Sequence, residues 1–157
     1  MSTRVTGVHG RLAELSLDLP LLGPPRCAYE PAVRAGNLLH VSGQISRAAT
    51  GEVLGGRLGE DADVADGVAA ARISALNLLA RIDGAIGLDN VAQVVKLNAW
   101  VASAKNAHGQ PEVADGASRL LLDVLGDAGR HARTALAAHV LPQGALVEVD
   151  AIVAVRP

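Results

Sequence analysis

Apolar residues recur at helical spacing between about residues 62 and 86, and they predict one long amphipathic helix. Its buried stripe, with members three or four positions apart, consists of Val64, Val68, Ala71, Ala75, Leu79, Ile82 and Ile86. The side chain of Asp61 or Asp63 can cap the first turn of this helix. Gly87 provides the residue at which the helix stops.

Shorter apolar segments predict strands on either side of this helix. Residues 31–45 are predicted to form two strands around a turn at Gly36-Asn37, and residues 91–102 a strand that is apolar on both faces. A second helix is predicted to begin at Pro111, where the missing N–H group costs nothing, and to end at Gly126.

The C-terminal segment is predicted to be a β-hairpin. Two apolar runs, residues 131–140 and 145–155, flank the turn segment L141-P-Q-G144. The predicted order is therefore two strands, a helix, a strand, a helix and a hairpin. This order favours an α+β fold in which two helices cover one face of one mixed sheet.

The sheet face that two helices leave uncovered is also predicted to be apolar. Val95, Leu97, Val101 and Leu136 alternate with residues that are themselves largely apolar. Phe is absent from the chain, so small side chains must build the core, to which Trp100 is assigned. We therefore expect further copies of the same chain to bury this second face.

Composition and charge disfavour several classes of function. The net charge is −2 and no basic run is interleaved with aromatic residues, which argues against nucleic acid as the ligand. The single cysteine, Cys27, excludes an intrachain disulfide, and the histidines lack metal-ligand spacing, so no metal site is expected. No signal peptide and no membrane-spanning segment is expected, and the cytoplasm is the favoured location.

Arg133 and Glu148 are the candidate functional pair. Each lies in one of the two apolar runs of the predicted hairpin, where a plain sheet needs no charge. Arg offers a rigid fork of donors for a carboxylate, and Glu can orient or deprotonate a water molecule. The pair indicates a small anionic substrate attacked by water. An ion pair with a structural role is the alternative that the pattern leaves open.

Two segments resemble the signatures of one family. The motif A-R-T-x6-L-P-x-G-x2-V-E-V-D-A-I-V, which begins at residue 132, is similar to the C-terminal signature of the Rid family (YjgF-like imine/enamine deaminases, formerly labelled L-PSP endoribonucleases). The segment Y29-E-P-A-V-R-A-G-N-L-L-H-V-S-G-Q-I45 is similar to the N-terminal signature of the same family. The order and spacing of the two segments also agree, and the resemblance covers about residues 25–156.

The resemblance implies a chorismate-mutase-like fold, assembled as a homotrimer whose sheets form an inner barrel. It implies a site for a small carboxylate that needs no cofactor. In that site Arg133 would bind the substrate carboxylate, and Glu148 would position or activate the hydrolytic water. Tyr29, Ser42 and the backbone at Ala135 would help to hold the ligand.

The chain also departs from the family pattern. Residues 1–24 are an N-terminal extension, with a short helix predicted at residues 11–17 and a Pro/Gly linker after it, and residues 25–157 are the Rid-like domain. C27-A-Y-E stands where the family has G-P-Y-S, and H131-A-R-T-A stands where it has P-A-R-S-C. Arg130 and His131 therefore adjoin the key arginine. These differences are typical of a longer, divergent subgroup.

The predicted function is the hydrolytic deamination of small 2-imino or enamine acids to 2-keto acids and ammonia. A second hypothesis is a non-catalytic binder or sensor of small carboxylates, which requires Arg133 equally. Glu148 favours catalysis, because a nearby negative charge weakens a pure carboxylate receptor. An endoribonuclease or translation inhibitor, a label that some relatives carry, is disfavoured by the acidic balance and the scarcity of aromatic residues.

Overall fold

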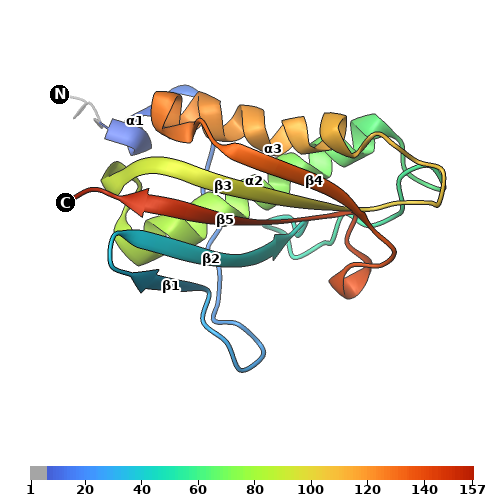
Figure 1. The fold of residues 1–157 in the computed structure, drawn as a ribbon, viewed down its shortest axis with the longest axis horizontal. Helices are drawn as coiled ribbons and strands as arrows, with labels where there is room; N and C mark the ends of the chain where they lie inside the picture. Colours follow the sequence, from blue (N-terminus) through green and yellow to red (C-terminus); the bar gives the residue numbers. More distant parts are fainter. Residues whose placement is uncertain (1–6) are drawn as a thin grey trace.

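The computed structural model describes residues 7–157 and contains one five-stranded sheet with the strand order β1-β2-β5-β3-β4 (Figure 1). The strands are β1 (Ala32–Ala35), β2 (Leu38–Ile45), β3 (Val91–Ala102), β4 (Ala132–Ala138) and β5 (Val147–Val155). β3 and β4 are parallel, and the other neighbouring pairs are antiparallel. The predicted single mixed sheet is therefore confirmed.

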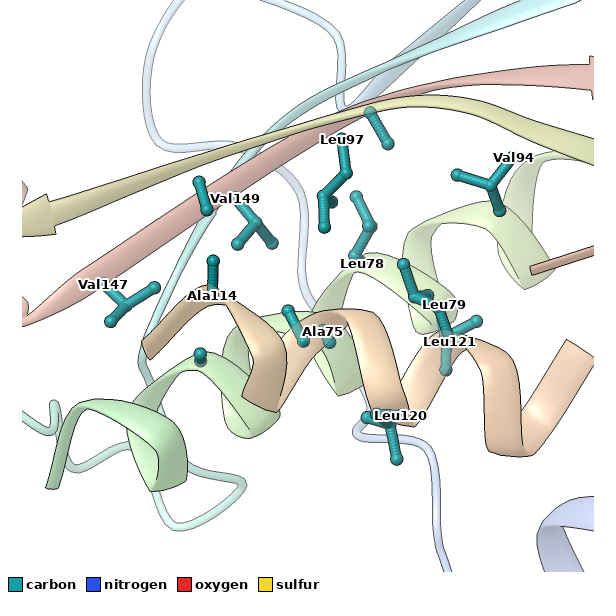
Figure 2. Close-up of a cluster of buried hydrophobic side chains, with 14 of the residues drawn as sticks. Ala75, Leu78, Leu79, Val94, Leu97, Ala114, Leu120, Leu121, Val147 and Val149 are labelled. Carbon is teal, nitrogen blue, oxygen red and sulfur yellow. The ribbon is translucent and has the colours of Figure 1, made fainter. Parts of the chain in front are cut away.

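Helices α2 (Val64–Ile86) and α3 (Gln110–Leu125) pack against each other and cover one face of the sheet (Figure 1). Figure 2 shows the core between the layers, where Leu97 and Val149 from the sheet point toward the helices, and Leu78 of α2 and Leu121 of α3 belong to the same core. All four of these side chains are fully buried. The predicted arrangement, with two helices on one face over a core of Ala, Val and Leu, is confirmed.

A short first helix, α1 (Gly7–Glu14), packs beside α3 and begins earlier than the predicted 11–17. The backbone N–H of Val8 donates to Asp89 Oδ1 at 2.8 Å, and His9 Nε2 lies 3.0 Å from Asp83 Oδ1. The N-terminal segment is thus bonded to the domain. Within residues 7–157, no helix is both long enough and apolar enough to span a membrane.

Local signals in the sequence explain where the long helix begins and ends. Asp63 accepts the backbone N–H of Asp66 at 2.9 Å, and Asp66 accepts the backbone N–H of Asp63 at 3.0 Å, which is a complete capping box. Gly87, with a φ of 77°, donates its N–H to the carbonyl of Asp83 and ends the helix. Both predicted boundaries of this helix are confirmed.

β4 and β5 do not form a hairpin, so this prediction was wrong. β3 lies between them, and Leu97 of β3 pairs with Arg133 on one side and with Ala151 on the other. β4 follows β3 through α3, and such a helical crossover places the second strand parallel to the first. The segment 139–146, with its short 3-10 turn at Pro142–Gly144, then leads past β3 to β5. Turn residues identify a turn, but they do not decide which strands become neighbours.

The sheet face that points away from α2 and α3, here called the open face, is not uniformly apolar as predicted. Lys96 Nζ donates to Thr134 Oγ1 at 2.7 Å, Asn98 Nδ2 donates to Asp150 Oδ1 at 2.8 Å, and Trp100 Nε1 donates to Asp150 Oδ2 at 3.1 Å. Trp100 therefore lies on the open face and not in the core. The exposed large apolar side chains of the strands are Val33, Val95 and Leu136. The open face thus combines a central group of hydrogen-bonded polar side chains with apolar side chains near both edges of the sheet.

Candidate active site

Glu148 lies on the open face of β5, opposite Trp100 of β3 and Ile45 of β2. Its neighbour across the β2–β5 pair is a bulge between Val41 and Gln44, which contains Gly43. A Cβ atom at Gly43 would overlap Glu148 Oε1, so a larger residue there would displace this carboxylate from its present position. The V-S-G-Q segment therefore provides the wall against which Glu148 is held.

The pKa of Glu148 is raised above its usual range, first because its side chain is partly buried and second because Asp150 repels its negative charge. Asp150 lies two residues along the same face and receives hydrogen bonds from Asn98 and Trp100. The negative charge of Asp150 favours the neutral form of Glu148. A carboxylate with a raised pKa is a better proton acceptor near neutral pH.

Glu148→Gln is expected to be at least as stable as the wild-type protein at neutral pH. Since the folded-state pKa of Glu148 is above the unfolded value, its stabilising contribution is present below the unfolded pKa and is lost as the pH rises through the folded pKa. An amide removes this dependence, so the advantage of the variant should disappear at about pH 4. Thermal unfolding at neutral pH and at about pH 4 measures the difference in stability between the variant and the wild-type protein. Glu52→Gln, on an exposed loop, is the control.

Ser42 adjoins Gly43, which lies against Glu148, and Tyr29 belongs to the segment that Ser42 holds. Ser42 Oγ donates to the carbonyl of Glu30 at 2.7 Å, and its backbone N–H donates to the carbonyl of Pro31 at 3.0 Å. These hydrogen bonds attach the segment that contains Tyr29 to the bulge that contains Gly43. Tyr29 itself is exposed. The structure thus brings the N-terminal signature and Glu148 into one region, called here the acid half-site.

Two further residues, Gln44 and Arg81, hold the acid half-site in place. The sequence motif V-S-G-Q includes Gln44, whereas nothing in the sequence indicated a role for Arg81. Gln44 Nε2 donates to the carbonyls of Ser42 at 2.8 Å and Gly43 at 3.1 Å, which fixes the bulge. Arg81 of α2 donates from Nε to Gln44 Oε1 at 3.4 Å and from Nη1 to the carbonyl of Gly23 at 2.9 Å. Arg81 therefore connects the N-terminal linker to the bulge.

Arg133 lies on β4 and faces α3. Its Nη1 donates to Asp115 Oδ1 at 2.7 Å and to Ser118 Oγ at 3.2 Å, and about a quarter of its side chain is exposed (24%). A pocket of about 300 Å³ lies here, lined by Ser118, Leu122, Arg130, His131 and Arg133. We call this region the arginine half-site. Ala135, two residues along the strand, pairs with the buried Ala99 and is half-buried.

The two half-sites do not meet within one chain. Arg133 pairs with Leu97, whose side chain faces the helices, whereas Glu148 pairs with Trp100 on the open face, and β3 separates their strands. The prediction that the two charges lie in adjoining strands was wrong, because it depended on the hairpin. The ion pair that Arg133 makes is with Asp115 of α3. Within residues 7–157, no cluster of three His, Cys, Asp or Glu side chains could hold a metal ion.

The comparisons with known proteins decide the family. The sequence model of the family described as "YjgF/chorismate mutase-like, putative endoribonuclease" matches residues 9–154. The chain belongs to this YjgF/chorismate-mutase-like family. Its fold is the YjgF fold, and the resemblance seen in the two sequence segments is confirmed.

Several relatives of this YjgF-family chain match it over nearly their full length. Protein TCP17 of Trypanosoma cruzi is 44% identical over 156 residues, which are 98% of each chain. The crystal structure of Atu1372 from Agrobacterium tumefaciens, described as having unknown function, is 41% identical with a TM-score of 0.88 and covers 94% of this chain and 92% of its own. A protein of Shewanella oneidensis MR-1, described as a putative endoribonuclease, is 33% identical with a TM-score of 0.90 and covers 95% and 99%.

Proposed function

We propose that this YjgF-family protein hydrolyses small 2-imino or enamine acids to 2-keto acids and ammonia without a cofactor. The observation that carries the proposal is the environment of Glu148, a partly buried carboxylate with a raised pKa that is held against Gly43. A group of this kind takes a proton from water more readily than an ordinary surface carboxylate does. A pure carboxylate receptor has no use for it.

The proposed reaction needs two functions, which the two half-sites supply separately. Arg133 binds the substrate carboxylate and so fixes the position of the imine carbon. The substrate reacts as the protonated imine: a water molecule attacks the carbon, the C–O bond forms as the π pair of the C=N bond moves to nitrogen, and a water proton passes to Glu148. Glu148 then gives this proton to the amino nitrogen. The C–N bond breaks, its electron pair leaves with ammonia, and the hydroxyl proton passes through Glu148 to the ammonia, so that the products are the keto acid and ammonium.

We propose that the substrate binds between two chains, with Arg133 from one chain and the acid half-site from its neighbour. The separation of Arg133 and Glu148 within a chain supports this arrangement. The exposed apolar side chains Val33 on β1 and Leu136 on β4 support contacts at both edges of the sheet. A closed ring of such contacts gives every pair of neighbours one complete site.

The expected assembly is a homotrimer. Light scattering at micromolar concentration should give three times the chain mass of 16.0 kDa. Leu136→Asp, which places a charge on the exposed apolar edge, should shift the mass toward that of a monomer, and Val64→Asp, at an exposed position on α2, serves as the control. A monomeric wild-type protein would remove the basis for a shared site.

The test of the proposed function is the removal of imines in solution. Imines produced from amino acids by an amino-acid oxidase, or from serine and threonine by a dehydratase, should disappear faster when the protein is added. Binding of 2-keto acids without any acceleration, over several imino acids, would favour a metabolite sensor. Cleavage of RNA with no effect on imines would favour the endoribonuclease label that the Shewanella relative carries.

A further inference from the structure

The Nη1 nitrogen of Arg133 is fully engaged inside the protein. Nη1 carries two N–H groups, and two acceptors lie within reach, Asp115 Oδ1 at 2.7 Å and Ser118 Oγ at 3.2 Å. Both acceptors come from one face of α3, less than one turn apart along the helix. Over residues 7–157 no acceptor is found for the Nε and Nη2 hydrogens of Arg133. The guanidinium is therefore held at Nη1, whereas its Nε–Nη2 edge has no acceptor among residues 7–157.

His131 fixes the direction of the hydrogen bonds behind Arg133. Its Nδ1 lies 2.6 Å from the carbonyl oxygen of Gly129, which can only accept, so Nδ1 carries the proton. In the neutral ring Nε2 must then accept, and the Ser118 hydroxyl, 2.8 Å away, must donate to it. The Ser118 oxygen keeps a lone pair for Arg133. One directed chain thus runs from Arg133 through Ser118 and His131 to Gly129.

Close packing holds two members of this chain in place. Gly129 lies so close to α3 that a Cβ atom there would overlap the carbonyl group of Leu121. Ser118 is buried, with 9% of its surface exposed. Asp115 is more exposed, and its Oδ2 also lies 3.8 Å from Nη2 of Arg119. Close packing thus restrains the backbone at Gly129 and the side chain of Ser118.

We propose that Ser118 and His131, with Asp115, are positioning residues that present the Nε–Nη2 edge of Arg133 to the ligand carboxylate. A guanidinium offers a carboxylate two flat edges, and the edge that includes Nη1 is occupied by α3. The remaining edge takes the carboxylate side-on, in the plane of the guanidinium. The inference rests on the proposed function only in that the ligand is a small carboxylate.

Calorimetry with 2-ketobutyrate tests the inference. Ser118→Ala and His131→Asn should each weaken binding about 3- to 10-fold, since each removes one hydrogen bond of the chain. His131→Asn keeps a donor for Gly129 and removes the Nε2 acceptor. Asp123→Asn, on α3 but away from Arg133, should bind as the wild-type protein does, and thermal unfolding confirms that all variants fold.

A double-mutant cycle separates positioning from general support of the fold. In an Arg133→Lys background, Ser118→Ala should cause little further loss, because the edge that it orients is gone. Nitrogen-15 NMR of the imidazole should show the Nδ1–H tautomer of His131 in the wild-type protein and a mixture in Ser118→Ala. Full additivity, wild-type affinity in both single variants, or an Nε2–H tautomer would overturn the inference.

The outcomes also separate this inference from the proposed catalysis. A wild-type protein that binds 2-ketobutyrate but does not hydrolyse imines contradicts the deaminase proposal and leaves the positioning of Arg133 in place. A wild-type protein that binds no small carboxylate overturns the positioning role as well.

Discussion

Glu148→Gln is expected to slow imine hydrolysis about 100- to 10,000-fold, the usual cost of a missing general base. Glutamine has the size of glutamate, so it fits against Gly43 without opening a cavity. Because its amide cannot accept a proton from water, the chemical step should be lost while the structure and the binding of 2-ketobutyrate are kept. The rate of imine disappearance in a coupled oxidase assay measures the effect.

Two observations make this result specific to the water-handling role. Glu52→Gln, on an exposed loop, should keep full activity. The light-scattering mass of Glu148→Gln should equal that of the wild-type protein, which shows that the substitution leaves the assembly unchanged. A fully active Glu148→Gln variant would rule out Glu148 as the proton acceptor, although the protein could then still act on imines by another route.

Arg133→Lys is expected to weaken the binding of 2-ketobutyrate by about 1.5–3 kcal/mol, because an ammonium group replaces a planar, two-pronged donor. Lysine can keep the ion pair with Asp115, so the loss should appear in ligand binding more than in stability. Calorimetry measures the affinity, and thermal unfolding measures the stability.

Arg119→Lys is the matched control for this variant. Arg119 also lies on α3, and its Nη2 is 3.8 Å from Oδ2 of the same residue, Asp115. The side chain of Arg119 is mostly exposed. The lysine variant should bind 2-ketobutyrate normally, since exposed ion pairs contribute little. Unchanged affinity in Arg133→Lys would mean that Arg133 serves only to bond β4 to α3.

The sequence predicted the elements of this fold well, because their signals are local. The stripe from Val68 to Ile86, the capping residue Asp63 and the stop at Gly87 together define α2. The placement of Val64 in the buried stripe was wrong, because this first residue of the helix is 40% exposed. Residues 91–102 become β3 as predicted. Each of these signals depends on neighbours within a few residues, which the sequence displays directly.

The pairing of the strands could not be predicted in the same way. Whether β5 lies beside β4 or beyond β3 depends on the crossover through α3 and on the free edge of β2. The residues of the turn at 141–144 give no information about the crossover or about that edge. The open face illustrates the same limit. Trp100 and Asp150 lie on strands far apart in sequence, and their hydrogen bond appears only when β3 and β5 are paired.

The candidate site was predicted as a set of residues but not as an arrangement. The motifs identified Arg133, Glu148, Ser42 and Tyr29, yet their partners Asp115, Ser118 and Arg81 belong to helices whose polar positions resemble ordinary solvent-facing ones. The separation of Arg133 from Glu148 follows from register, since Leu97 and Trp100 point to opposite faces of β3.

The location of Arg133 and Glu148 at different places on the sheet has a genetic consequence. If neighbouring chains share each cleft, two inactive alleles, one altered at Arg133 and the other at Glu148, can complement each other in one cell. A mixed ring contains one cleft in which the intact arginine of one subunit meets the intact acid of the next, so random mixing restores roughly a quarter of the clefts. Two alleles altered at the same residue restore none.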